Sequence, residues 1–387
     1  MNIKIILGAL LTLFVLVTTT NVSALPAFAR KNNIKCSSCH TTYPTLTPLG
    51  RQFKEAGYRF TGSDVGDATL SDYLQFDKNF PMSLALVSRP YNNSKLGTRE
   101  IRAIHEGELY AGGEIYKNVS GFLEIEAEGE DGFGLVVTSA SITYNQSRVL
   151  NIQTGYGPTL MADPYDTYAD MRRLTASHYE IMNQTFGGAD NADKMRHARQ
   201  QVSVYGRPLN NLFYYAGVGG LTEDKVGSDS SIYFARLAFD ITQNMMVGGM
   251  LLKGSCKLSD CTSATQSRDF SRLAIDGQFE IGHFRLTGVY MQAKDDSNTG
   301  IQATNNGYYI QAIYHLMENG RPTLVPLLRL ETYEKNNGQD KYSLATANIT
   351  YYFTENVKGF IEYQDTYDAP TGVARDNITT LQAEIVF

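Results

Sequence analysis

The chain has 387 residues, of which 42% are hydrophobic and 19% charged, and its formal net charge is −6 at pH 7. That balance is not basic enough for a nucleic-acid-binding protein, and the length alone would allow two or three domains. Tyrosine is unusually frequent at 25 residues and tryptophan is absent, a composition that argues against ordinary globular domains.

Residues 1–24 predict a cleavable signal peptide. A single cation, Lys4, precedes an apolar run over residues 5–17, and a small-x-small site ends at Ala24. The run is too short for a membrane anchor, and no later segment approaches the roughly eighteen apolar residues that a transmembrane helix needs. We therefore expect the mature protein to leave the cytoplasm without a transmembrane helix.

Shortly after that signal, residues 36–40 form a C-x-x-C-H motif. Two thiols at this spacing can each add to a vinyl group of haem, and the next imidazole can bind the iron. The motif predicts one covalently attached haem c, bound through Cys36 and Cys39, with His40 as an iron ligand. The competing interpretation is a thiol–disulfide redox pair, but the stretch of about fifty residues before the next domain is too short for a thioredoxin-like fold.

Residues 25–78 are expected to form a small α-helical monohaem cytochrome c domain. Residues 25–60 hold six cations and one acid, Glu55. Thr47 followed by proline is typical of a helix start, and Gly57 of a helix end. The cations could balance haem propionates, face solvent or contact an acidic neighbour.

The second axial ligand of the iron is left open by the sequence. Residues 41–77 contain no methionine and no second histidine. Met82, at the start of the next domain, is the nearest candidate, and His105 follows, although simple alternation would turn His105 toward lipid. An open or water-bound position is the alternative, and methionine ligation would raise the haem potential.

Residues 79–387 predict an all-β domain, because their hydrophobic pattern has period two. The C-terminal segment shows it well: Leu381, Ala383 and Ile385 alternate with polar residues. A tilted strand needs about ten such residues to cross a bilayer. Sixteen segments fit this pattern: 81–90, 102–115, 119–128, 135–144, 150–157, 200–206, 212–220, 230–241, 245–253, 269–280, 283–293, 307–316, 324–333, 343–353, 357–366 and 376–387.

The connections between these segments alternate between short and long. Residues 117–118 and 210–211 are short turns, whereas 92–101 and 158–199 are long loops. Short periplasmic turns and long external loops are typical of an outer-membrane barrel, and an even strand number returns the chain to the side where it started. We expect an antiparallel β-barrel of about sixteen strands, porin-like, in contact with outer-membrane lipid, plugged by the haem domain, with both termini on the periplasmic side.

Acidic side chains would line the interior of that barrel. Glu124, Glu126 and Glu128 alternate with apolar residues, and Glu106 and Glu108 share the lumen side of the neighbouring segment. A lumen of this kind attracts cations, although the carboxylates could also be solvated or paired with arginines.

Two further groups could bind metal or form a crosslink. The loop over 161–199 carries six carboxylates with His178 and His197, and mixed His and carboxylate ligands could bind an ion such as Fe(II). A solvated loop is the plain alternative. Cys256 and Cys261 are separated by four residues and predict a loop disulfide in an oxidising compartment, with a metal site as the alternative.

The N-terminal motifs carry a resemblance to a known family. Pro26-Ala-Phe-Ala-Arg30, the C-x-x-C-H motif, Tyr43-Pro44-Thr-Leu46 and residues 48–58 together resemble the fused outer-membrane monohaem cytochrome c-porins, the Fe(II) oxidases of iron-oxidising bacteria. The resemblance continues at residues 108–112 and 121–122; beyond about residue 145 only the architecture matches. It implies that Cys36 and Cys39 carry the haem and that His40 is its proximal ligand.

By that resemblance, electrons would pass from extracellular Fe(II) to a periplasmic c-type cytochrome, and the protein would act as an Fe(II) oxidase. Two alternatives remain. One is a diffusion porin or cation channel with a haem-bearing plug, which liposome conductance would reveal. The other is an outward-directed electron conduit with another redox partner, which a strongly negative midpoint potential would favour.

Overall fold

The computed structural model describes residues 27–32, 34–60, 81–170, 173–184, 194–220, 230–256, 268–296, 301–318 and 320–387. The predicted signal peptide lies outside these ranges, as does Cys261, so the proposed disulfide with Cys256 stays a prediction. No helix in the described ranges is long and apolar enough to cross a membrane.

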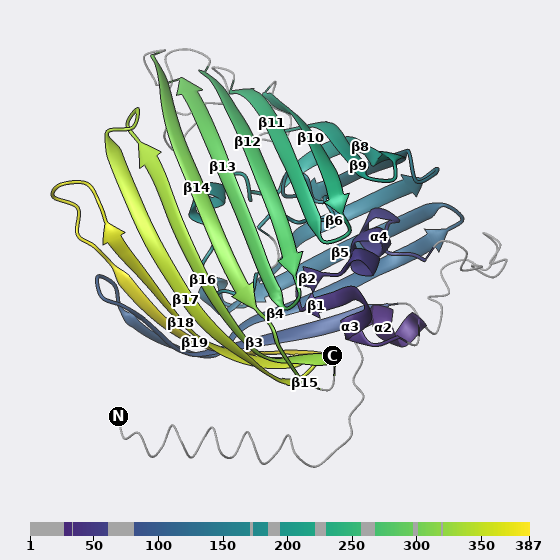
Figure 1. Ribbon diagram of the computed structural model, residues 1–387, viewed down its shortest axis with the longest axis horizontal. Helices are drawn as coiled ribbons and strands as arrows, with labels where there is room; N and C mark the ends of the chain where they lie inside the picture. The colour runs from purple at the N-terminus through teal and green to yellow at the C-terminus, as the bar shows by residue number, and fades with distance from the viewer. Residues whose placement is uncertain are drawn as a thin grey trace.

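Sixteen antiparallel strands close into one barrel, each pairing with its neighbours in the chain, and β19 pairs with β3 to complete the ring (Figure 1). The short β15 continues the line of β14 against β16. The barrel strands are β3 (Met82–Ser94), β4 (Arg99–Tyr116), β5 (Val119–Glu128), β6 (Leu135–Asn145), β7 (Asn151–Gly157), β8 (Arg199–Leu209), β9 (Leu212–Gly219), β10 (Ser231–Thr242), β11 (Met245–Cys256), β12 (Arg268–Ile281), β13 (Phe284–Asp296), β14 (Gln302–Tyr314), β15 (Leu316–Glu318), β16 (Arg321–Lys335), β17 (Asp340–Thr354), β18 (Val357–Asp368) and β19 (Asn377–Val386).

The predicted antiparallel barrel of about sixteen strands is confirmed. The bounds of β5 coincide with the predicted segment 119–128. Other strands run further toward the long loops than the hydrophobic pattern extends; β14 begins at residue 302 rather than 307. Outside an apolar environment a strand pair needs only its backbone hydrogen bonds, so its polar ends carry no period-two signal.

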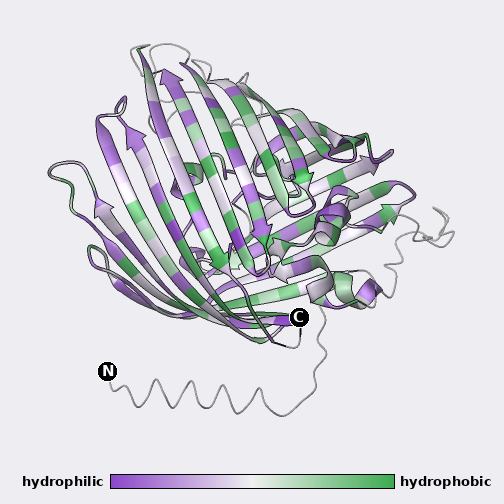
Figure 2. Cartoon of the chain, in the orientation of Figure 1, coloured by the Kyte–Doolittle hydropathy of each residue, from purple (hydrophilic) through white to green (hydrophobic). Residues whose placement is uncertain are grey.

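The strands turn apolar side chains outward and polar side chains into the lumen, the reverse of a water-soluble barrel. On β17, Ile349 is 51% exposed and points outward, whereas Asn348 and Thr350 are at most 1% exposed and point into the lumen. The same alternation of apolar and polar residues recurs along neighbouring strands (Figure 2). A closed barrel with an apolar outer surface leaves no unpaired strand edge and is one of the two structures that can span a bilayer.

A small unit precedes the barrel and lies at the end where the short turns and the C-terminus gather (Figure 1). It consists of α2 (Ala27–Asn32), α3 (Cys36–Cys39), the two-stranded sheet of β1 (His40–Thr42) and β2 (Thr45–Leu46), and α4 (Pro48–Glu55). The side chain of Thr47 caps α4 by accepting a hydrogen bond from Gly50 N, as predicted. Gly57 follows the helix with φ of 68°, a left-handed value that glycine adopts without strain. We call residues 27–60 the front unit.

A long loop between β7 and β8 folds into the barrel and carries α5 (Glu180–Asn183); a 3₁₀ turn, η1 (Gly129–Asp131), follows β5. Leu160, Tyr168, Ile181 and Met182 of the loop are fully buried and belong to one apolar cluster. That cluster includes inward-facing residues from β8 through β14 and from β16 and β17. The lumen is therefore packed with protein along this part of its wall. We call residues 158–184 the lumen loop.

Candidate functional site

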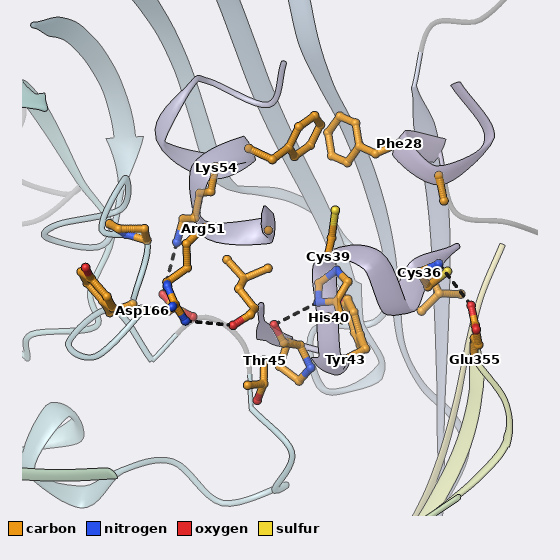
Figure 3. Close-up of a pocket in the computed structure, with 18 of the residues that line it drawn as sticks. Phe28, Cys36, Cys39, His40, Tyr43, Thr45, Arg51, Lys54, Asp166 and Glu355 are labelled. Carbon is orange, nitrogen blue, oxygen red and sulfur yellow. Dashed lines mark hydrogen bonds and ion pairs between the residues drawn. The ribbon is translucent and has the colours of Figure 1, made fainter. Parts of the chain in front are cut away.

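A cavity of about 280 Å³ lies between the front unit and the barrel. Cys36, Cys39 and His40 line it, and residues from the barrel and the lumen loop complete its wall. Figure 3 shows these three side chains with Phe28, Arg51 and Glu355 around them. The motif found in the sequence thus borders a partly open cavity at the end of the barrel.

The cysteine pair and His40 are brought together by one short element. Cys36 and Cys39 begin and end α3, so one helical turn separates them, and His40 follows directly as the first residue of β1. His40 Nδ1 lies 3.3 Å from the carbonyl oxygen of Pro44, which orients the ring when Nδ1 carries the proton. Burial lowers the pKa of His40 to about 4, so the imidazole is neutral at pH 7. A neutral ring with Nε2 left for a ligand suits an iron atom.

Cys36 is held by a residue of the barrel. Glu355, in the turn between β17 and β18, accepts hydrogen bonds from Cys36 N at 3.1 Å and from Ser37 Oγ at 3.3 Å. Burial and the nearby Glu355 carboxylate raise the pKa of Cys36 to about 11, and burial also raises that of Cys39. A thiol–disulfide redox pair needs a lowered thiol pKa, so this environment argues against that interpretation and suits cysteines whose sulfurs are alkylated.

One half of the cavity is aromatic. The Phe28 ring lies 5.0 Å from Phe53 and 5.4 Å from Tyr58, and Tyr58 in turn stacks on Phe122 of β5 at 5.0 Å, all between ring centroids. Phe60 packs on Phe53 at 4.7 Å. These five rings line the cavity, so it could accept a flat apolar group such as a porphyrin.

The front unit is fixed to the barrel by a buried charge network. Arg207 of β8 donates three hydrogen bonds of 2.7 to 2.9 Å to the Glu55 carboxylate and one of 2.6 Å to Asp240. Arg59 reaches Glu114 at 3.5 Å, and Lys54 reaches Asp166 of the lumen loop at 3.7 Å. The sequence suggested only that the basic stretch over residues 25–60 could meet acidic neighbours. The pairing of Glu55, the one acid of that stretch, with Arg207 had no local signal.

Met82 is not brought to the cavity. It is 44% exposed on β3, while the next residue, Ser83, lines the cavity and accepts a hydrogen bond from Ala27 N at 2.8 Å. Since successive residues of a strand point to opposite faces, Met82 points away from the front unit. His105 is 4% exposed on β4, beside Arg102, and does not line the cavity either. The expectation that His105 meets lipid is therefore wrong.

Among the described residues that line the cavity there is no methionine and no histidine besides His40. Neither sequence candidate is thus in place as the second axial ligand, and the structure supplies no substitute of the same two residue types within this wall.

Carboxylates line the barrel wall next to the cavity. Tyr110 and Phe122 border the cavity. Glu108 and Glu124 lie two residues further along β4 and β5, away from the cavity, and point to the same side of the sheet. Further out, Glu106, Glu108 and Glu126 each place a carboxylate oxygen within 4.8 Å of the other two. The predicted acidic lumen wall therefore exists, and it leads toward the cavity.

The carboxylates of the lumen loop are occupied by protein partners. Asp163 pairs with Arg236 of β10 at 3.0 Å, and Asp170 lies 2.8 Å from His178 Nδ1 and 3.6 Å from Arg173. Asp163 thus fixes the loop to the wall, whereas Asp170 ties the loop to itself. Asp190 and Asp193, two of the six carboxylates in the loop predicted as a possible metal site, lie outside the described residues.

Neither a protein-family model nor a curated protein sequence matches this chain. Solved structures do resemble it. An anion-selective porin from Comamonas acidovorans aligns with a TM-score of 0.61 and 12% identity, covering 79% of this chain and 98% of that one. An in-vitro folded OmpT of Vibrio cholerae gives 0.58 at 13% identity, covering 79% and 98%. OmpF of Salmonella typhi in complex with daunomycin gives 0.57 at 16%, covering 80% and 97%. The chain therefore has the fold of outer-membrane porins.

Proposed function

We propose that this protein is an outer-membrane electron conduit with one haem c. The observation that carries the proposal is the position of the C-x-x-C-H motif: Cys36, Cys39 and an oriented, neutral His40 border an aromatic cavity at the end of a porin-like barrel. The apolar outer surface supports a place in the outer membrane. The short turns, the front unit and the C-terminus would then lie on the periplasmic side.

The fit of the site to haem c rests on its own residues. Cys36 and Cys39 would form the two thioether bonds, and His40 would bind the iron through Nε2, because Nδ1 faces Pro44 O. When bound, the haem would supply a one-electron carrier. The aromatic half of the cavity would exclude water from the ring, and Glu355 would keep the N-terminus of α3 in place.

The donor we propose is extracellular Fe(II), and the acceptor a periplasmic c-type cytochrome. One electron leaves Fe(II), which becomes Fe(III), and one electron reduces the cytochrome. The lumen wall with Glu106, Glu108 and Glu126 would favour a cationic donor over an anionic one. An Fe(II) donor that enters the lumen from the outer side would leave its ferric product on that side of the front unit. In this role the chain is an Fe(II) oxidase.

A cation channel with a haem-bearing plug is the second candidate, since the acidic wall would suit cations. The packing of the lumen loop on the opposite wall disfavours it, because Leu160, Ile181 and Met182 occupy space that an open channel would fill with water. An outward conduit uses the same residues and differs only in direction. A strongly negative midpoint potential would favour it over Fe(II) oxidation.

Stopped-flow mixing of the oxidised haem-containing protein with Fe(II) tests the proposal. We expect the haem absorbance to change to that of the reduced form within seconds at neutral pH. The matched variants are His40→Ala, which removes the iron ligand and should abolish a normal haem spectrum, and His283→Ala, an exposed histidine that should leave the spectrum unchanged. A normal spectrum without reduction by Fe(II) would eliminate the iron-oxidase claim alone. Absence of covalent haem would eliminate the conduit itself.

A further inference from the structure

The cavity has a second half whose chemistry the aromatic rings do not explain. Arg51 of α4 lines it, together with Gln278, Arg285 and Gln311 from β12, β13 and β14. The opposite half is made of phenylalanine and tyrosine rings. A ligand that fills both halves must be apolar along one edge and form hydrogen bonds along the other.

Arg51 is a buried cation without a matching anion. Its side chain is 9% exposed, and its hydrogen bonds go to two backbone carbonyls, of Leu46 and of Gln243 in the turn after β10. No carboxylate within the described ranges forms an ion pair with it. Burial lowers the pKa of its guanidinium, and the carboxylates of Glu280 and Asp240 offset only part of this effect. An anion bound beside it would offset more of this effect.

Gln311 is a second group with an incomplete set of partners. It is 6% exposed and donates from Nε2 to the Tyr179 hydroxyl at 3.2 Å, while its Oε1 has no partner in the described part of the chain. If the amide is turned, Tyr179 donates to Oε1 and the Nε2 donor becomes the free group. A buried amide that can present a free N–H to the cavity that Arg51 also lines matches a carboxylate acceptor.

The other charged residues of this half give it a positive balance. Lys54 and Arg285 also line the cavity. Lys54 has its carboxylate, Asp166, at 3.7 Å, and Arg285 pairs with Glu280 while donating to Gln278 Oε1 at 2.8 Å. Asp166 and Glu280 each have one cation as a partner, so the positive charge of Arg51 is left over. A metal cation would be repelled here, whereas an anion would be attracted.

We propose that Arg51 and Gln311 form a carboxylate-binding subsite and that the haem propionates occupy it. The inference rests on the proposed function, because it needs a haem attached at Cys36 and Cys39. It makes Arg51 a positioning residue: the thioether bonds fix one part of the ring, and the subsite would fix the carboxylate part. A free carboxylate or phosphate from the periplasm is the other possible source of the same chemistry.

The test uses purified protein in which covalent haem has been verified. Arg51→Gln removes the positive charge, and Arg148→Gln is the control, an exposed cation bonded to Asn210 at the same end of the barrel. We expect the midpoint potential of Arg51→Gln to fall at pH 7, because a positive charge near the ring opposes oxidation of the iron. The midpoint potential changes with pH around the pKa of the propionates, and we expect this pKa to be about one unit higher in Arg51→Gln. The propionate band in resonance Raman spectra should shift as well.

Three outcomes separate the claims. An Arg51→Gln protein with attached haem and unchanged midpoint curve and Raman band would overturn the subsite. Wild-type protein whose midpoint responds to added acetate or phosphate, with the response lost in Arg51→Gln, would assign the subsite to a free anion and overturn the propionate assignment. Wild-type protein without covalent haem would overturn the proposed function instead. Gln311→Leu, a change on β14 outside the front unit, provides the same readouts if Arg51→Gln does not fold, with smaller shifts in the same direction.

Discussion

The C-x-x-C-H residues are held at their two ends by different parts of the molecule. The carbonyl of Pro44, within the front unit, faces His40, whereas Glu355 of the barrel binds Cys36 and Ser37. The Tyr352 hydroxyl of β17 donates to Tyr43 O at 2.8 Å and adds a second link. The position of the cysteine pair is therefore set by the barrel as well as by its own short helix.

The acidity of Cys36 can be tested in protein made without haem attachment. Its pKa of about 11, raised from 9.0 by burial and by Glu355, lies above the unfolded value, so the folded protein favours the thiol. That preference is complete below about pH 9 and is lost as the pH rises through 11. At pH 8 we expect alkylation by iodoacetamide to be about a hundredfold slower than in the unfolded chain. Glu355→Gln should speed it, and Glu318→Gln, which changes an exposed carboxylate that does not line the cavity, should not.

An alkylation rate of Cys36 whose pH dependence gives a pKa near 7 would contradict this prediction. It would also revive the thiol–disulfide interpretation, because that chemistry depends on a thiolate near neutral pH.

At the scale of elements, the docking of α4 depends on one arginine. Arg207 is 7% exposed at its side chain and Glu55 12%, and both Glu55 and Asp240 lose their ion-pair partner if Arg207 is removed. We expect Arg207→Gln to weaken the docking by about 2–3 kcal/mol, since breaking a buried pair leaves an uncompensated charge. Amides of α4 should then exchange with deuterium roughly 30- to 150-fold faster.

Arg375→Gln is the control for that measurement. Its ion pair with Asp368 is 3.8 Å long and more than half exposed on both sides, so its loss should change stability little. Unchanged exchange of α4 in Arg207→Gln would mean that the aromatic contacts alone hold the front unit.

The strands could be predicted because each repeats a local rule. Every second residue of a strand meets the same surroundings, so all sixteen segments showed period two. The helix cap was local as well, because Thr47 directly precedes Pro48 in the sequence. The period-two rule would have excluded Met82. It shares its face with Leu84 and Leu86, while Ser83, Ala85 and Val87 are buried. The pleat of β3, and not nearness in sequence, decides which residue meets the cavity.

Contacts between distant segments could not be predicted in this way. Arg207 and Glu55 are 152 residues apart, and Cys36 and Glu355 are 319 apart. The lumen loop gave an irregular pattern, because its apolar residues meet several strands rather than one face. The loop over 161–199 could be seen to carry carboxylates, but the sequence did not indicate that Asp163 and Asp170 would pair with arginines inside the barrel.

For the whole molecule, the packed lumen predicts low conductance. The lumen loop covers one wall and the front unit lies at one end, so we expect liposomes with the wild-type protein to carry far less current than an open porin of the same strand number. Ile181→Asp combined with Met182→Asp places charges in the apolar cluster and should release the loop, raising the current several-fold. Val373→Asp, an exposed residue between β18 and β19, is the control. Large currents through wild-type protein would favour the channel.

The burial of the cysteine pair also constrains how the protein can be made. Cys36 and Cys39 are half-buried between the front unit and a barrel that closes only when β19 pairs with β3. On the proposed function, an enzyme that attaches haem must reach both sulfurs, and the closed barrel would obstruct it. Attachment therefore has to come first, while the exported chain is still in the periplasm, and insertion into the membrane second. A maturation defect would then reduce the amount of barrel in the membrane as well as the amount of cytochrome.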